Sequence, residues 1–386
     1  MYHLIFIVLL LASTYEFFSE SSKKIGIFLF LMLLAFVTLR YGQGSDYFNY
    51  IYLFSNSSDE FENLIINRDI SHITTELGFS AISYIWLKLF SLSPESLSAL
   101  FSAISFIFIW LFIKKYSIKP ILSLFIFYCT FYLIYPFSGI RQGVCISIFI
   151  YYLIPLLYKR DYIKYYLWSL VLFSIHFSSI VLFILPVVNL VKNYNLKQVF
   201  ILAIVALGAG IALNQLLFSF FSTLDLIGSK VGTYTQDGSF DILSLLLRIV
   251  IFVPIIQTYN IYERNSIRDL FLKIYILGFL LYLTFMTSAL ISSRINVYMR
   301  YFEIILLVDL LQYLFLKKTN KVLGYTYIIA IMSFLYVKNI DSFIDQGSYY
   351  GHVNFYNYPY VTLFEKKKID DYRYIEPYFR KYIIYY

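Results

Sequence analysis

The chain has 386 residues, of which 60% are hydrophobic and 14% charged, and its formal net charge is +8. Soluble domains carry about 25% charged residues, and a soluble protein with so apolar a surface would aggregate. The composition therefore predicts an all-α polytopic integral membrane protein. In such proteins excess positive charge gathers in cytoplasmic loops, so the charge gives no support to nucleic-acid binding.

Apolar runs along the chain are long enough to predict membrane spans. They cover residues 2–18, 25–39, 97–113, 119–137, 140–158, 199–221, 241–260, 269–291, 296–316 and 322–337. The first run lacks a basic leader and a cleavage site, so we expect a retained helix.

Two further runs are ambiguous. Residues 77–91 are short and carry Lys88, and they predict either a span or a re-entrant or interfacial helix. Residues 162–191 predict either one tilted helix or two short helices hinged near His176. We expect about twelve transmembrane or half-spanning helices in a membrane domain at 1–337, followed by a polar, tyrosine-rich tail at 338–386.

Lysine and arginine clusters predict the orientation. The short basic clusters can all be cytoplasmic if 77–91 does not cross fully and 162–191 forms a hairpin. Loops 40–76 and 222–240 are then external. The arginines near 40, 141 and 294 share that extracytoplasmic side. The tail contains Lys366-Lys367-Lys368, which fits poorly outside, so its side stays open.

Several classes of chemistry lack support in the sequence. Cys129 and Cys145 lie in apolar runs without a C-x-x-C motif or a histidine cluster, so neither a disulfide nor a metal site is expected. No Walker loop, G-x-G-x-x-G or H-E-x-x-H motif occurs. We expect no metal and no cofactor.

Arginines beside apolar runs are the candidate binding residues, because ionisable groups in membranes are costly unless they have a partner or a function. Arg40 follows one run and precedes Asp46 across two glycines, which predicts a ligand-binding turn or an interfacial ion pair. Arg141-Gln142 opens a predicted helix, where N–H groups and a guanidinium together suit a diphosphate. The alternative for Arg141 is an anchor at the lipid headgroups.

Two more candidates lie further along the chain. His176 is a possible general base or phosphate donor, or a hydrogen-bonded structural histidine. Arg294, Tyr298 and Tyr301 share a helical face, with Arg300 on the same turn region, and predict either a phosphate contact or an interfacial belt.

The motifs resemble the EpsG family of bacterial polysaccharide proteins, which includes Wzy-type polymerases. The resemblance lies in four segments, in this order: Leu39-Arg40-Tyr41-Gly42 with Gly44 and Asp46-Tyr47, Glu76-Leu77-Gly78-Phe79, Ile140-Arg141-Gln142, and Ile175-His176-Phe177-Ser178-Ser179. Gly143 and Cys145 depart from the alanines that such proteins often carry.

The resemblance implies a metal-independent membrane glycosyltransferase of GT-C-like architecture in the bacterial inner membrane. It would transfer a growing glycan from undecaprenyl diphosphate onto a new lipid-linked repeat unit at the periplasmic face, with a chain-length regulator as a candidate partner. On this interpretation substrate contacts are assigned to Arg40, Tyr47, Arg141, Gln142, Arg294, Tyr298 and Arg300. His176 and Asp46 are the candidate bases, with His176 preferred. A polysaccharide-lipid flippase and an O-antigen ligase are the alternatives.

Overall fold

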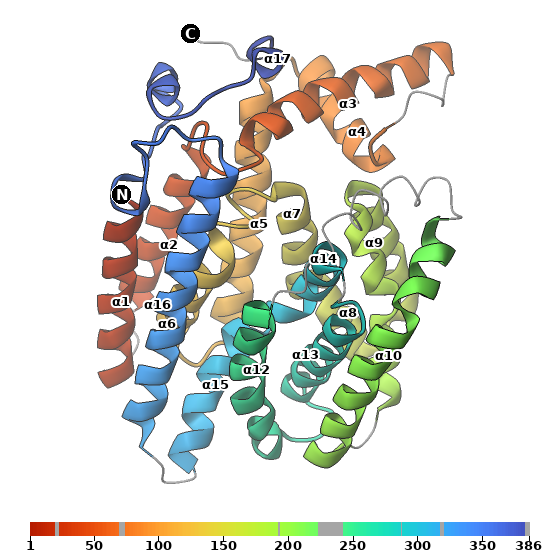
Figure 1. Cartoon of the computed structure of the whole chain (residues 1–386), viewed down its shortest axis with the longest axis vertical. Coiled ribbons are helices and arrows are strands. Elements are labelled where there is room, and N and C mark those ends of the chain that lie inside the picture. Colours follow the sequence, from red (N-terminus) through yellow and green to blue (C-terminus); the bar gives the residue numbers. More distant parts are fainter. Residues whose placement is uncertain are drawn as a thin grey trace. The chain divides into compact units, whose positions relative to one another are not determined.

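The computed structural model describes residues 1–19, 23–68, 74–191, 194–222, 242–286, 288–316 and 320–382, with the backbone alone at 211–222, 289–291 and 315–316. Regular structure in these residues is helical, with isolated bridges and no strand, which confirms the expected all-α class (Figure 1). The chain divides into two compact units. Unit 1 comprises Met1–Pro155, Ile163–Ser179 and Val322–Tyr386, and unit 2 comprises Leu156–Tyr162 and Ile180–Lys321.

Among the described residues, four helical segments are long and apolar enough to cross a membrane. They are Pro94–Tyr116, Ile140–Lys159, Ile242–Ile261 and Lys321–Gln346. Other apolar helices are shorter, including Tyr2–Phe18, Leu77–Leu89 and Tyr162–Ile175. A membrane-embedded helical protein is therefore supported, whereas twelve crossing or half-crossing helices stay a prediction.

Unit 1 is built on a central helix, α5. Its helices are α1 (Tyr2–Phe18), α2 (Lys23–Thr38), α3 (Tyr47–Asn67), α4 (Leu77–Tyr84), α5 (Pro94–Tyr116), α6 (Pro120–Phe127), α7 (Ile140–Ile148), α9 (Tyr162–Ile175), α16 (Lys321–Gln346) and α17 (Pro377–Arg380), with part of α8 (Ile154–Lys159). α5 packs against α2 and α7. The sequence favours this helix, because Ser93 caps it, Pro94 opens it and basic Lys114 and Lys115 end it.

The segment 40–76, predicted as an external loop between spans, contains the 21-residue helix α3, which was not predicted from the sequence. Tyr47, Tyr50, Ile51 and Phe54 recur at helical spacing and are all buried. Polar residues on the opposite face make the helix amphipathic rather than uniformly apolar, which conceals it from a search for spans. The predicted external loop 222–240 lies outside the described residues beyond Ser222.

The stretch 162–191 confirms the second of its two predicted forms. α9 ends at Ile175, and 3-10 helices follow at Phe177–Phe183 and Leu185–Leu190, so His176 stands at the break. The predicted span 296–316 is also interrupted. α14 (Ala289–Arg300) ends before α15 (Glu303–Leu316) begins.

The tail folds onto unit 1 instead of forming a separate polar extension. The His3 ring bonds the Phe355 carbonyl at 2.6 Å, and the Tyr360 hydroxyl donates to Phe36 O at 2.9 Å. Lys366 pairs with Glu95 at 3.0 Å. In Figure 1 the tail crosses the ends of α1 and α2 that lie near the loop before α3. The lysines 366–368 therefore share the side of loop 40–46, whichever side of the membrane that is.

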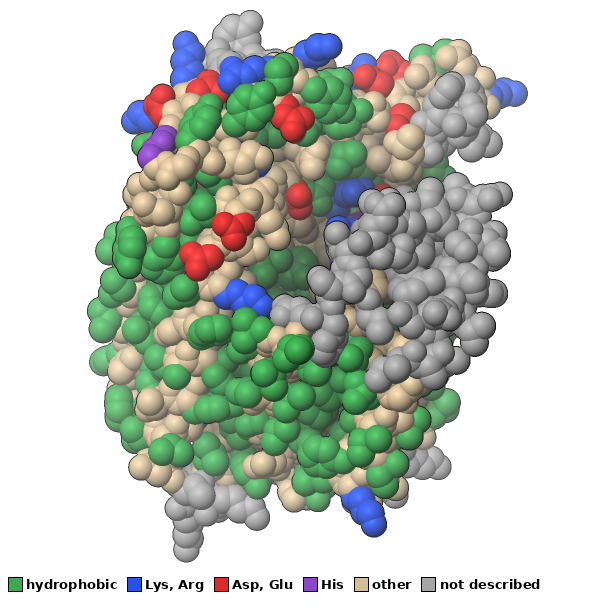
Figure 2. All heavy atoms as spheres, viewed as in Figure 1, with side chains coloured by type: hydrophobic (Ala, Val, Ile, Leu, Met, Phe, Trp, Pro, Cys, Tyr) green, Lys and Arg blue, Asp and Glu red, His purple; other side chains and the backbone are tan. Residues whose placement is uncertain are grey.

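Charge and apolar surface are separated within unit 1. Figure 2 shows charged side chains gathered around α3 and the tail, and hydrophobic side chains along the helix sides. On α1, for example, Leu4, Ile7 and Leu11 are each at least half exposed. An apolar flank of this kind suits contact with lipid chains.

Unit 2 packs around α13 (Ile267–Thr284), which contacts α10 (Leu196–Ser222) and α14. α12 (Ile242–Ile256), extended by a 3-10 turn to Ile261, packs against α15. The rings of Phe252 and Phe279 stack with centroids 3.8 Å apart and join α12 to α13.

Gly78 is expected to be needed for the approach of α4 to α9. A Cβ at this position would lie 2.2 Å from Ser174 Oγ and 2.9 Å from the Ser174 carbonyl. Gly78→Ala should lower the free energy of unfolding in detergent by about 1–3 kcal/mol through overpacking.

The control is Gly208→Ala, where no atom lies within 4 Å of the new methyl group. Removing the hydroxyl in a Gly78→Ala/Ser174→Ala double variant should recover part of the loss. Equal stability of Gly78→Ala and the unmodified protein would contradict the close contact.

Candidate functional site

The strongest candidate site in unit 1 is built on the ion pair between Arg141 and Glu76. Arg141 Nη1 lies 2.7 Å from Glu76 Oε2, and the two side chains are 15% and 12% exposed. Arg141 stands in the first turn of α7, as predicted, and Glu76 immediately precedes α4. Each carboxylate–guanidinium contact of this kind is short and charge-assisted, so Glu76 fixes where the guanidinium points.

Aromatic rings complete the surroundings of Arg141. Its guanidinium carbon lies 4.6 Å from the ring centre of Phe79 and 5.7 Å from that of Tyr50. The Arg141 side chain also hydrogen-bonds that of Tyr50, but its buried Nε has no hydrogen-bond partner among the described residues. Because a buried donor without an acceptor costs free energy, the guanidinium keeps one donor that the described fold does not satisfy.

Glu76 also connects Arg141 to the break beside His176. Its Oε1 accepts a hydrogen bond of 3.1 Å from the backbone N–H of Phe177. His176, 8% exposed, closes α9 through its own N–H, which donates to Leu172 O. The structure thus brings the Arg141 guanidinium and the backbone of Phe177, the neighbour of His176, to the two oxygens of one carboxylate. Gln142 is buried in the same turn as Arg141.

Arg40 has a structural role in unit 1 and does not face an open site. Its Nε and Nη2 donate to Phe137 O, at 3.2 and 2.6 Å, and its Nη1 donates to Val37 O and Ser102 Oγ. The side chain is 2% exposed. Burial lowers the pKa of the Arg40 guanidinium, but an arginine stays charged at neutral pH. These contacts favour the structural alternative over a phosphate contact.

Asp46 and Tyr47 also serve the local structure. Asp46 precedes α3, and its backbone N–H donates to Ser138 Oγ at 3.2 Å. Tyr47 is 2% exposed and packs edge-on against Tyr41. Burial raises the pKa of Tyr47, which keeps its hydroxyl protonated at neutral pH.

The remaining predicted residues belong to unit 2. Arg300 pairs with Glu303 through Nε–Oε1 at 3.2 Å, and Tyr275 donates to the same oxygen at 3.3 Å. Tyr298 is fully buried, while Arg294 is half-buried on α14. Arg294 and Arg300 thus share one helix, but Tyr298 points into the packed interior, which does not favour a substrate contact for its ring.

Sequence reasoning missed Glu76 and Arg248. Glu76 lies within one of the segments that carry the family resemblance, and this was its available signal. Arg248 interrupts the apolar run of α12, which marks a functional or paired charge. Its guanidinium lies 4.0 Å from the Tyr282 ring centre and is close enough to Arg300 and Glu303 to interact electrostatically. With the amide of Asn296 oriented to donate to Gly278 O, its oxygen accepts from Arg248 at 2.7 Å.

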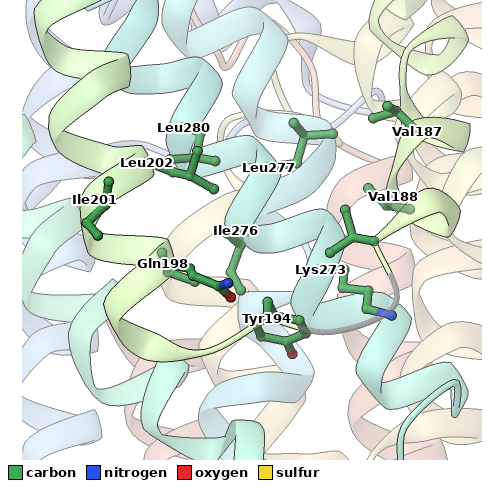
Figure 3. Close-up of a pocket in the computed structure, with 12 residues that line it drawn as sticks. Val187, Val188, Tyr194, Gln198, Ile201, Leu202, Lys273, Ile276, Leu277 and Leu280 are labelled. Atoms are coloured by element: carbon green, nitrogen blue, oxygen red, sulfur yellow. The ribbon is translucent and has the colours of Figure 1, made fainter.

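A cavity of about 440 Å³ in unit 2 has a different chemical character. Figure 3 shows aliphatic side chains around most of it, with Tyr194, Gln198 and Lys273 at one end. Lys273 is held by Asp269 at 2.8 Å. No predicted site residue lines the cavity, and its surface suits a hydrocarbon chain rather than a sugar or a phosphate.

The described residues contain no group of three or more histidine, cysteine or acidic side chains placed to hold a metal ion. The candidate site in unit 1 contains guanidinium, imidazole and carboxylate groups. In unit 1 these groups can bind an anion and transfer a proton.

These features define an α-helical membrane protein that keeps arginines among apolar helices. The chain belongs to the EpsG family, whose model matches residues 23–362, and it is thus a polysaccharide-related membrane protein. The family resemblance drawn from the motifs is confirmed at that level. No curated protein and no solved structure matches the chain.

Replacing Arg40 should affect stability. Arg40→Lys keeps the charge but cannot reach Phe137 O, Val37 O and Ser102 together, because lysine lacks the planar fork. We expect a loss of about 1–3 kcal/mol in the free energy of unfolding in detergent.

Arg380→Lys is the matched control, since Arg380 is exposed and binds Asp370 and the Ile375 carbonyl at the surface. An unchanged unfolding midpoint for Arg40→Lys together with lost activity would instead assign Arg40 to the substrate.

Proposed function

We propose that this protein polymerises oligosaccharide repeat units carried on undecaprenyl diphosphate, as a metal-independent membrane glycosyltransferase acting at the periplasmic face of the bacterial inner membrane. The observation that carries the proposal is the Arg141 guanidinium. It is anchored by Glu76 at a helix N-terminus, has a buried N–H without an acceptor, and lies across one carboxylate from the His176 segment.

The reaction requires a binding site for a diphosphate. The bond between the anomeric carbon of the donor glycan and its phosphate oxygen breaks, and the departing diphosphate gains negative charge. Arg141 and the positive end of α7 would stabilise that charge in an environment shielded from water. Glu76 reduces the net charge of the site, but it holds the guanidinium in one orientation, and this lowers the cost of reorganisation during the reaction.

The second requirement is a base for the acceptor sugar. Its hydroxyl oxygen forms the new bond to the anomeric carbon, and its proton passes to the base. We assign this role to His176, because imidazole titrates near neutrality and His176 stands beside Phe177, which is bonded to Glu76. Asp46 is the weaker candidate, since it contacts Ser138 and immediately precedes α3.

Arg141→Ala should abolish polymerisation. A strain lacking the protein and complemented with this variant should show single repeat units on lipopolysaccharide or capsule gels instead of a ladder, because the leaving group loses its main cation. Removing one such electrostatic contact costs about 100- to 1,000-fold in rate.

The same gel separates the alternatives. In the deletion strain, polymer that stays on its lipid carrier would indicate a ligase, and absence of even the single repeat would indicate a flippase. A full ladder from Arg141→Ala would remove this residue from the site.

His176→Gln should retain membrane accumulation but slow elongation by about 100-fold or more, since general-base catalysis contributes about that factor. Glutamine preserves hydrogen-bonding capacity without a titratable nitrogen. The measurement is the rate of ladder formation from the lipid-linked repeat unit in membranes.

His352→Gln is the matched control, because His352 is exposed in the tail. Normal elongation by His176→Gln would exclude His176 as the base and bring Asp46 forward.

A further inference from the structure

The tail contains a buried arginine that binds the loop leading into α3. Arg373, 5% exposed, donates through Nη1 to Gly42 O at 2.9 Å and Gly44 O at 2.8 Å. Its Nη2 donates to Ser45 O at 2.9 Å. One guanidinium thus fixes three carbonyl groups of a single short loop.

The backbone of this loop needs such support. Gly44 has φ +94°, a conformation that only glycine adopts readily. A Cβ at Gly44 would lie 2.9 Å from Phe137 O, so the loop also runs directly against the turn that precedes α7. Carbonyls turned inward in an apolar region require donors, and Arg373 supplies them.

Further backbone pairing holds the tail in place. Tyr41 N–H donates to Val361 O at 2.8 Å, and Leu363 N–H donates to Leu39 O at 2.9 Å. Arg373 itself is set by an antiparallel bridge with Tyr349 and lies between the rings of Tyr349 and Phe48, at 5.4 and 5.1 Å.

Two sets of contacts connect the position of this loop to that of the candidate site. Ser45 Oγ and Ser138 Oγ are 2.7 Å apart, which connects the loop to the turn before α7 and Arg141. The loop also sets the start of α3, whose Tyr50 ring lies 5.7 Å from the Arg141 guanidinium.

We propose that Arg373 is a positioning residue for the Arg141 site, acting from the C-terminal tail through the carbonyls of Gly42, Gly44 and Ser45. The proposal rests on the function assigned above, and it makes the tail part of the catalytic unit. Arg373 does not contact the substrate. Its loss should therefore impair turnover more than binding, because a displacement of about 1 Å can cost about 100-fold in rate.

The first test reports the loop position independently of activity. A Ser45→Cys variant is labelled with a maleimide in membranes, against a low background because Cys129 and Cys145 are buried. Adding Arg373→Gln should accelerate labelling of the cysteine at position 45 several-fold. It should leave labelling of a cysteine placed at exposed Asn49 unchanged.

The second test measures elongation of the polyprenyl-diphosphate-linked repeat unit in proteoliposomes. Arg373→Gln should lower kcat about 10- to 100-fold with little change in KM. Lys368→Gln, which removes only an exposed pair with Glu365, should behave as the unmodified protein. Arg373→Lys should not restore turnover, since an ammonium cannot match three carbonyls as the guanidinium fork does.

The outcomes separate the two claims. If Arg373→Gln accelerates labelling but the unmodified protein does not elongate glycans, the contact between Arg373 and the loop is supported and the proposed function is rejected. Unchanged labelling and unchanged kcat would overturn the positioning role. If neither Arg373→Gln nor Arg373→Lys accumulates in membranes, Arg373 serves folding as a whole, and the positioning role is also overturned.

Discussion

A guanidinium in an apolar helical bundle must meet oxygen atoms, and this requirement decides what each arginine of unit 1 can do. Arg40 and Arg373 direct their hydrogen bonds mainly at backbone carbonyls that helices and turns leave unpaired. Arg141 meets one carboxylate and keeps a buried N–H without an acceptor. The Nε of Arg373 is also buried without a hydrogen-bond partner among the described residues. Its two other nitrogens nevertheless bind three carbonyls of one loop, so Arg141 retains the greater capacity for a ligand.

Unit 2 meets the same requirement less completely. Arg248 and Arg300 lie within electrostatic range of one carboxylate, Glu303, and Arg248 relies on the Tyr282 ring and the Asn296 amide for direct contacts. Desolvation of two like charges is costly unless something offsets it. The burial of Arg248 is thus less well compensated than that of Arg300. The sequence had instead predicted Arg294 and Arg300 as the site residues of this unit.

Local pattern predicted the features that depend on a few neighbouring residues. The α-helical class, the start of α7 at Ile140 and the break at His176 follow from hydropathy and from helix-terminus chemistry. α3 was missed because its apolar residues occupy one face only. The side-chain roles were harder to predict. The sequence pattern of an arginine beside a span is the same whether its guanidinium binds carbonyls, as that of Arg40 does, or a ligand. Only the tertiary fold distinguishes the two.

The contact between Arg373 and Gly44 joins residues 329 positions apart, a separation that no local pattern reveals. It also sets an order of assembly. Because Arg373 follows α16 in the chain, the loop before α3 can acquire these hydrogen bonds only after the last long apolar helix has been made. Contacts between distant segments form late, since the loop-closure entropy must be met first. The positive-φ loop beside the turn that leads to Arg141 would then be fixed at the end of folding, so that a chain lacking its tail would insert its helices but leave this loop unsupported.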